Sequence, residues 1–167
     1  ASGDKVIFSA VDNKIYSGLD FSSDITPASA TITANNWKIV SFNNHTYFYQ
    51  RGHEPLIYTD SSGSGVLVKH SDFANQTTPP QANEVIGAYG RLWAADVSGN
   101  TKTVYWSDTL QGHKWSGGTA GSLDLTTVFP TGHDEVVALA AHNGFLIIFC
   151  KRSIIIYSGA ESPATMQ

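Results

Sequence analysis

The sequence predicts an all-β fold, a partial β-propeller of about three and a half four-stranded antiparallel blades. The first observation behind this prediction is a repeated strand end, an apolar run that stops at small polar turn residues. The runs lie at 13–18, 55–60, 103–108 and 153–159. Their tyrosines are separated by 42, 47 and 52 residues: Tyr16, Tyr58, Tyr105 and Tyr157. Propeller blades repeat at about this interval.

The second observation is a hairpin that precedes three of these strand ends. Residues 38–51, 84–96 and 135–151 each read as two apolar strands joined by a tight turn. The turns contain asparagine or glycine, which tolerate the positive φ of short hairpin loops. The three predicted turns are Asn43-Asn44-His45, Tyr89-Gly90 and His142-Asn143-Gly144.

Three β-rich segments lie further upstream and are candidate first strands of the blades: 29–34, 65–70 and 122–128. We therefore expect one propeller region over residues 1–167, with blades or blade remnants at 5–18, 29–60, 65–108 and 122–159. The first of these supplies only the last two strands of a blade. Because such an arc cannot close a ring of four to eight blades, we expect a longer protein, blades from other chains or an open arc. A β-sandwich with coincidental spacing is the alternative fold.

Composition excludes some classes of function. Charged residues make up 14% of the chain, against roughly 25% in an ordinary soluble domain. The net charge of −4 gives no broad basic face for nucleic acid. The longest apolar runs are far shorter than the roughly 20 residues of a membrane-spanning helix. Cys150 is the single cysteine, so no internal disulfide forms, and its apolar run predicts a buried side chain.

One stretch, YWSDTLQGHKW at 105–115, resembles the Ser-x-Asp-x-Gly-x-x-Trp turn of sialidase-type propellers, the Asp-box. Ser107 and Trp115 are one residue further apart than in that turn, and Asp108 stands one place early. The Asp-box is itself a structural turn. We expect Asp108 to accept bonds from turn amides, Gly112 to permit the bend and Trp115 to pack between blades.

Catalytic chemistry finds little support in the sequence. Glycosidases need two carboxylates, and sialidases an arginine cluster with a Tyr–Glu pair. Glu84 and Glu135 recur at blade starts, which favours a repeated structural role over one convergent site. The same holds for the three arginines, which the repeats put near the third strand of separate blades. The acids near strands are Glu54, Glu84, Asp96, Asp134 and Glu135, and the arginines are Arg51, Arg91 and Arg152.

Histidine and tryptophan patterns also favour structural roles. The six histidines form neither a His-x-x-x-His pair nor an HExxH motif, and we expect His45 and His142 to hold equivalent hairpin positions. The stretches 20–24 and 96–100 are weak candidates for Ca²⁺. The tryptophans are Trp37, Trp93, Trp106 and Trp115, and packing between blades is favoured over sugar stacking. We therefore expect a protein that is not an enzyme, with no catalytic, cofactor-binding or metal-binding residues.

The C-terminal quarter carries a family resemblance. LDLTTVFPTGHDEVVALAAHNGFLIIFCKRSIIIYSGAESPATM (123–166) resembles a segment of the tail tubular protein B, or nozzle, group of short-tailed bacteriophages (podoviruses), in particular marine phages. The blocks that carry it are 132–135, the turn 142–144 and 154–160. Upstream, 90–96 and 104–108 are compatible, whereas residues 1–80 agree only through the blade pattern.

The resemblance implies a virion structural protein. Nozzle subunits form a homo-oligomeric ring around the DNA exit channel, contact portal or adaptor proteins and tail fibres, and have no catalytic residues. Genomic DNA would pass without sequence-specific binding, and a net charge of −4 is compatible with such a conduit. The alternative is a carbohydrate-binding or sialidase-like propeller, a receptor-binding or glycan-processing module. A scaffold that binds protein partners is the third option.

Overall fold

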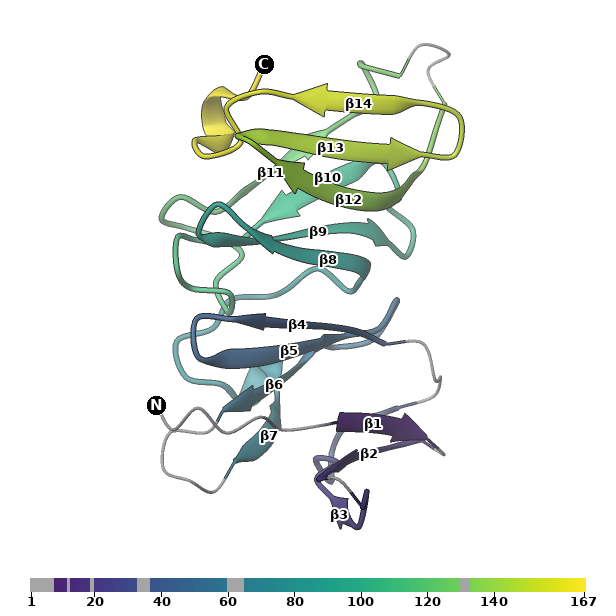
Figure 1. Ribbon diagram of the computed structural model, residues 1–167, viewed down its shortest axis with the longest axis vertical. Helices are drawn as coiled ribbons and strands as arrows, with labels where there is room; N and C mark the ends of the chain where they lie inside the picture. The colour runs from purple at the N-terminus through teal and green to yellow at the C-terminus, as the bar shows by residue number, and fades with distance from the viewer. Residues whose placement is uncertain (1–7, 12, 19, 33–36, 60–64, 130–132) are drawn as a thin grey trace.

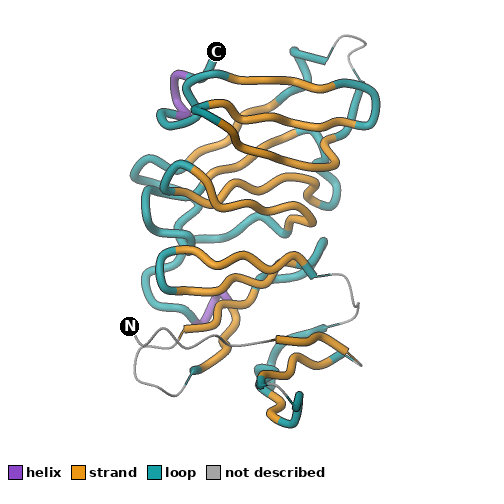
Figure 2. The backbone as a smooth tube through the Cα atoms, in the orientation of Figure 1, coloured by secondary structure: helices purple, strands orange, loops and turns teal. Residues whose placement is uncertain are grey.

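The computed structural model describes residues 8–11, 13–18, 20–32, 37–59, 65–129 and 133–167. Its strands form four antiparallel sheets, each a meander of strands that follow one another along the chain. The sheets lie one above another in a stack, in the order of the sequence (Figures 1 and 2). The all-β prediction is confirmed, and the stack has the arrangement of blades in an open propeller arc.

The strands are short, as expected for blades, and two 3-10 turns, η1 (His70–Asp72) and η2 (Pro163–Thr165), lie outside them. The first sheet contains β1 (Phe8–Val11), β2 (Lys14–Ser17) and β3 (Ser23–Asp24). The second contains β4 (Lys38–Phe42), β5 (His45–Tyr49), β6 (Leu56–Thr59) and β7 (Val66–Lys69). The third contains β8 (Ala82–Ala88), β9 (Arg91–Val97), β10 (Thr103–Trp106) and β11 (Gly121–Asp124). The fourth contains β12 (Val136–His142), β13 (Phe145–Cys150) and β14 (Ile154–Tyr157).

Two-residue turns join the first two strands of the second, third and fourth sheets. In each turn both central residues have positive φ, which matches the twist of the paired strands. They are Asn43-Asn44, Tyr89-Gly90 and Asn143-Gly144. The predicted hairpins are therefore confirmed, but His45 and His142 do not occupy equivalent positions. The strand register pairs Phe42 with His45 and His142 with Phe145, so the two histidines lie on opposite sides of their turns.

The sheets pack face to face because alternate strand residues point to opposite faces. Ile15, Phe48, Leu56 and Leu67 fill the space between the first and second sheets. Aromatic side chains contribute to the other two contacts between neighbouring sheets. The contact between the second and third sheets includes Tyr47, Tyr49, Ile57, Leu92 and Trp115, and the one between the third and fourth includes Trp93, Trp106, Leu139, Leu146 and Ile148.

The predicted division into blades needs correction. Residues 65–70 and 122–128 were expected to begin the blades that follow them, but β7 pairs with β6 and β11 pairs with β10. They are thus the fourth strands of the preceding sheets, because a strand that follows a short loop pairs most readily with its predecessor. In the segment 29–34, residues 33 and 34 lie outside the described residues and 29–32 are not strand. The blades are 38–69, 82–124 and 136–157 instead of 29–60, 65–108 and 122–159.

The first strands of successive sheets lie closest to the neighbouring sheets. β4 contacts β8, and β12 contacts both β8 and β9, so these strands run along one side of the stack. In the first sheet, β3 adds a third strand to the two predicted for 5–18, of which residues 5–7 lie outside the described part. In the described part of the chain, no helix is long and apolar enough to cross a membrane.

Candidate functional site

The Asp108 turn is a structural device, as expected. Its carboxylate accepts hydrogen bonds from Thr119 N (2.9 Å) and Oγ1 (2.6 Å), Thr109 N (2.9 Å) and Gln111 Nε2 (3.1 Å). The hydrogen bonds from Thr119 lower the pKa of Asp108 most. A side chain at Gly112 would lie 2.7 Å from Leu92 and 2.8 Å from Tyr47, so glycine gives room for these packed side chains. The bend that Gly112 was expected to permit lies at Leu110, which has a positive φ (56°), whereas Gly112 does not. Trp115 is buried between the second and third sheets.

The acids singled out from the sequence are engaged in separate contacts. Glu84 joins three sheets, because it pairs with Lys38 Nζ (2.8 Å) on β4 and accepts from Leu139 N (3.3 Å) on β12. Asp96 pairs with Arg51 (2.7 Å) between the second and third sheets. The other acids accept hydrogen bonds from residues of their own sheet and its loops. Glu54 accepts from Ser71 N, Asp134 from Glu135 N and Ser153 Oγ, and Glu135 from Lys151 Nζ.

The three arginines do not converge. Arg91 is buried at the start of β9, where its Nη1 donates to Ser107 O (3.0 Å) and Thr119 Oγ1 (2.8 Å). Burial lowers the pKa of Arg91. Arg51 and Arg152 instead follow the ends of β5 and β13. The arginines thus lie at the ends of the strands that the sequence placed third in each blade. Because each blade begins one strand later than predicted, these are second strands, with Arg91 at one end and the other two at the opposite end.

The tryptophans of the third sheet and its loop are packing residues. Trp93 and Trp106 lie 5.7 Å apart between their ring centroids in the contact with the fourth sheet. Trp93 Nε1 donates to Ala88 O and Trp106 Nε1 donates to Thr119 O. Trp115 contacts Tyr49 edge to face, with ring centroids 6.3 Å apart. Packing between blades is thus confirmed for these three.

A buried polar cluster, which the sequence did not reveal, lies beside the contact between the second and third sheets. His70 and Tyr47 are fully buried, and among the described residues neither the ring nitrogens of His70 nor the Tyr47 hydroxyl has a hydrogen-bond partner. Burial, with a smaller effect of His113, lowers the pKa of His70 to about 4. Burial also lowers the pKa of His45 and His113 and raises that of Tyr47. These histidines are therefore neutral at pH 7.

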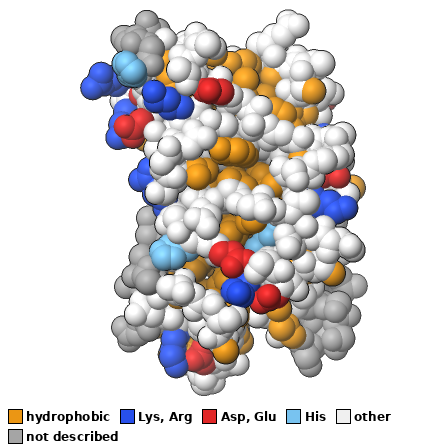
Figure 3. Space-filling model, turned by 180° about the vertical axis from the view of Figure 1, so that it is seen from behind, with side chains coloured by type: hydrophobic (Ala, Val, Ile, Leu, Met, Phe, Trp, Pro, Cys, Tyr) orange, Lys and Arg blue, Asp and Glu red, His pale blue; other side chains and the backbone are white. Residues whose placement is uncertain are grey.

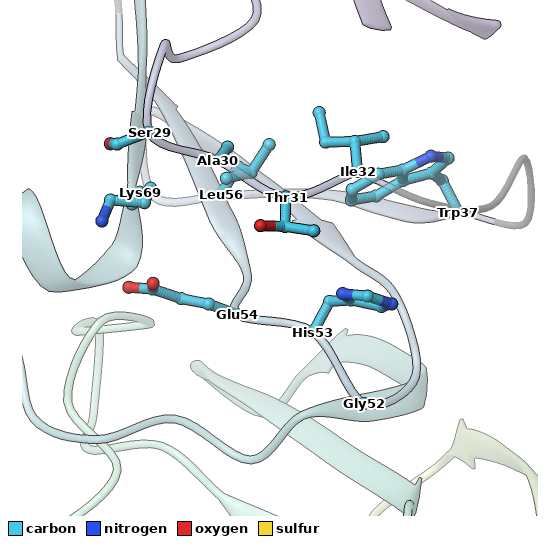
Figure 4. Close-up of a pocket in the computed structure, with 10 residues that line it drawn as sticks. All are labelled: Ser29, Ala30, Thr31, Ile32, Trp37, Gly52, His53, Glu54, Leu56 and Lys69. Carbon is cyan, nitrogen blue, oxygen red and sulfur yellow. The ribbon is translucent and has the colours of Figure 1, made fainter. Parts of the chain in front are cut away.

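A small pocket of about 200 Å³ is lined by residues 29–32, by Trp37 and by residues of the second sheet and its loops (Figure 4). Trp37, His53, Glu54 and Lys69 are among its lining side chains. Burial raises the pKa of Glu54, but hydrogen bonds from Ser71 outweigh it, so the net shift is downward. This lining offers one ionised carboxylate, whereas glycoside hydrolysis needs two.

Metal binding has no support in the described part of the chain, where no three His, Cys, Asp or Glu side chains are grouped to hold an ion. The acids of the stretches 20–24 and 96–100 are engaged in other contacts, Asp96 in its pair with Arg51. Asp20 accepts from Ser22, and Asp24 pairs with Lys14. Cys150 is half-buried, less than expected, and burial raises the pKa of its thiol.

The outer face of the fourth sheet is apolar and uncovered among the described residues. Its most exposed large side chains are Ile154 (61%) and Ile156 (58%), and Val137, Phe145 and Phe149 are also exposed. By contrast, cationic and anionic side chains are mixed on the back of the molecule, with no single basic patch in view (Figure 3).

Comparison of the chain with protein-family models, with curated proteins and with solved structures finds no match.

Proposed function

We propose that this chain is a virion structural protein, a subunit of a bacteriophage tail nozzle that works by assembly and not by catalysis. The observation that supports it best is the uncovered face of the fourth sheet. Contiguous apolar surface of this kind marks protein contact sites. A blade that ends a stack in this way needs a neighbour to bury that face.

The repeat shows which residues would meet that neighbour. Three cross-strand pairs hold the same position in successive sheets: Tyr47–Ile57, Trp93–Trp106 and Ile147–Ile156. The first pair is buried against the third sheet and the second against the fourth. The third pair keeps the apolar character, although Ile156 is 58% exposed. The fourth sheet thus carries the residues of a blade contact, and among the described residues nothing packs on them.

In the proposed nozzle, copies of the chain form a ring around the DNA exit channel. Stiff, closely packed blades would hold loops against portal or adaptor proteins and tail fibres. The net charge of −4 suits a path along which DNA slides, because strong phosphate binding would slow it. Two of the three arginines, Arg51 and Arg91, and the tryptophans Trp93, Trp106 and Trp115 are held in the contacts described above and not in a common sugar site.

Assembly in the native particle tests this proposal. Cross-linking and mass spectrometry of purified virions, combined with electron microscopy, should find this sequence in a ring below the portal. A glycan panel incubated with the purified chain should remain intact, and sugars should not change its tryptophan fluorescence. A chain found only as a free monomer outside virions, or one that cleaves a glycan, would refute the proposal.

A further inference from the structure

The small pocket beside the second sheet has a charged end and an apolar end. In Figure 4 the ends of the Glu54 and Lys69 side chains lie at one side of the pocket, and Ile32 and the ring of Trp37 lie at the other. Ile32 is buried in the core between the first and second sheets, and Trp37 packs against that core. A molecule that fills the pocket therefore meets charges at one end and apolar side chains at the other.

Strand pairing brings the two charged side chains to the same end of the pocket. Leu56 at the start of β6 pairs with Lys69 at the end of β7. Opposite residues of an antiparallel pair lie on the same face of a sheet. Glu54 lies two residues before Leu56, and its carboxylate accepts a hydrogen bond from Ser71 N (2.6 Å), just after β7. The sheet and this hydrogen bond thus hold a carboxylate and an ammonium group on one wall.

Glu54 and Lys69 carry opposite charges but are not ion-paired with each other. The ion pairs of the described residues all join other side chains. Burial raises the pKa of Glu54, but hydrogen bonds from Ser71 and the charge of Lys69 lower it by more, so the carboxylate is ionised at pH 7. Ser71 N donates to one carboxylate oxygen, Oε1. The other oxygen and the Lys69 ammonium group therefore have hydrogen-bonding capacity for a ligand.

This charge arrangement disfavours a ligand with a single charge. An anion beside Lys69 would be repelled by Glu54, and a cation beside Glu54 would be repelled by Lys69. A molecule that carries both charges on neighbouring atoms interacts favourably with both side chains. The volume of about 200 Å³ is below the roughly 300–1,000 Å³ of common ligand pockets, so the molecule must be small. A small zwitterion with an apolar body meets all these conditions.

We propose that this pocket binds a free α-amino acid with an apolar side chain. The carboxylate of the ligand accepts hydrogen bonds from Lys69 Nζ, and its ammonium group donates to Glu54 Oε2. Its side chain packs against Ile32, Leu56 and Trp37, which line the pocket. This inference goes beyond the proposed function and does not depend on it, because the site lies within one chain and needs no assembly.

A set of related ligands tests the site on the wild-type chain by NMR. L-Leucine should shift the Trp37 indole N–H and the Lys69 amide, with a Kd of about a millimolar, as expected for so small a ligand. L-Leucinamide lacks the carboxylate and N-acetyl-L-leucine lacks the ammonium group, so each should bind about tenfold more weakly. These analogues also resemble the first and last residues of a peptide. If either binds as tightly as leucine, the pocket takes a chain end and the inference is wrong. Glucose should cause no shift, and binding as tight as that of leucine would also overturn the inference.

Two substitutions assign the charges of the ligand to their partners. Lys69→Gln should raise the Kd for leucine about tenfold and remove the preference for leucine over leucinamide, because both changes delete the same contact. Glu54→Gln should do the same for N-acetyl-leucine, and it keeps an acceptor for Ser71 N. Lys151→Gln is the matched control, because Lys151 is ion-paired with Glu135 in the fourth sheet, and it should leave the Kd unchanged.

The inference and the proposed function fail separately. No shift with leucine at tens of millimolar, or variants at Glu54 and Lys69 that bind leucine like the wild type, would overturn the amino-acid site alone. Leucine binding as expected, together with virions that lack the chain, would refute only the tail function.

Discussion

The third and fourth sheets begin with the same kind of hairpin but differ in their number of strands and in how many of their faces are covered. The third has four strands, covered faces on both sides and an outer loop closed by Asp108. The fourth has three strands, one covered face and an uncharged edge. The pattern that makes a blade therefore does not determine whether the blade is covered. Among the described residues, the third sheet has a packed neighbour on each face and the fourth has one.

Identical substitutions at equivalent positions of a covered and an uncovered sheet test this difference most directly. Ile57 is fully buried between sheets, whereas Ile156 is 58% exposed at the same place in the fourth sheet. Ile57→Ala should destabilise the fold by about 2–5 kcal/mol through lost burial and a cavity. Ile156→Ala should change stability by about 0.5 kcal/mol or less in the monomer. Urea unfolding at low protein concentration measures both, and equal losses would show that the face is covered in solution.

Acid should weaken the contact between the second and third sheets. Because burial depresses the pKa of His70 from 6.5 to about 4, the unfolded chain binds a proton in this range that the folded chain does not. Stability from this group is complete above pH 6.5 and decreases toward pH 4, by about 3 kcal/mol in total. Unfolding between pH 7.5 and 4 should show this slope. His70→Asn should flatten it and the exposed His142→Asn should not, so an unchanged slope in His70→Asn contradicts the assignment.

The Asp108 turn is found in the covered third sheet and has no counterpart described for the fourth sheet. Asp108→Ala removes the acceptor of four hydrogen bonds that close the loop over the third sheet and should destabilise the chain by about 1–3 kcal/mol. Asp124→Ala, which removes exposed bonds to Thr126, is the control and should lose clearly less stability than Asp108→Ala. Thermal unfolding measures both. Equal losses would mean that the Asp108 turn adds nothing to blade closure.

Sequence patterns predicted local structure better than sheet membership. The turns at 43–44, 89–90 and 143–144 were predictable because two-residue loops demand residues that tolerate positive φ. The sheet to which residues 65–70 and 122–128 belong was not predictable, because a short apolar strand does not indicate which neighbouring strand it pairs with. The role of Asp108 followed from turn chemistry. The burial of His70 did not, since it begins a polar loop and its surroundings come from residues far along the chain.

The smallest effect concerns two glutamates that begin corresponding blades. Glu84 is nearly buried. It forms an ion pair with Lys38 on β4 and accepts a hydrogen bond from Leu139 N on β12, so it links three sheets. Glu135 pairs with Lys151 on an exposed rim of one sheet. Glu84→Gln should cost about 1–2 kcal/mol, because a buried charged partner is lost. Glu135→Gln should cost much less, because an exposed ion pair is screened by water and adds little stability. Denaturation in low and high salt measures both. Salt should reduce only the Glu135 effect, since screening acts mainly on exposed pairs. Equal costs would mean that covering a blade does not strengthen its ion pairs, and the difference between the two sheets would then rest on apolar packing alone.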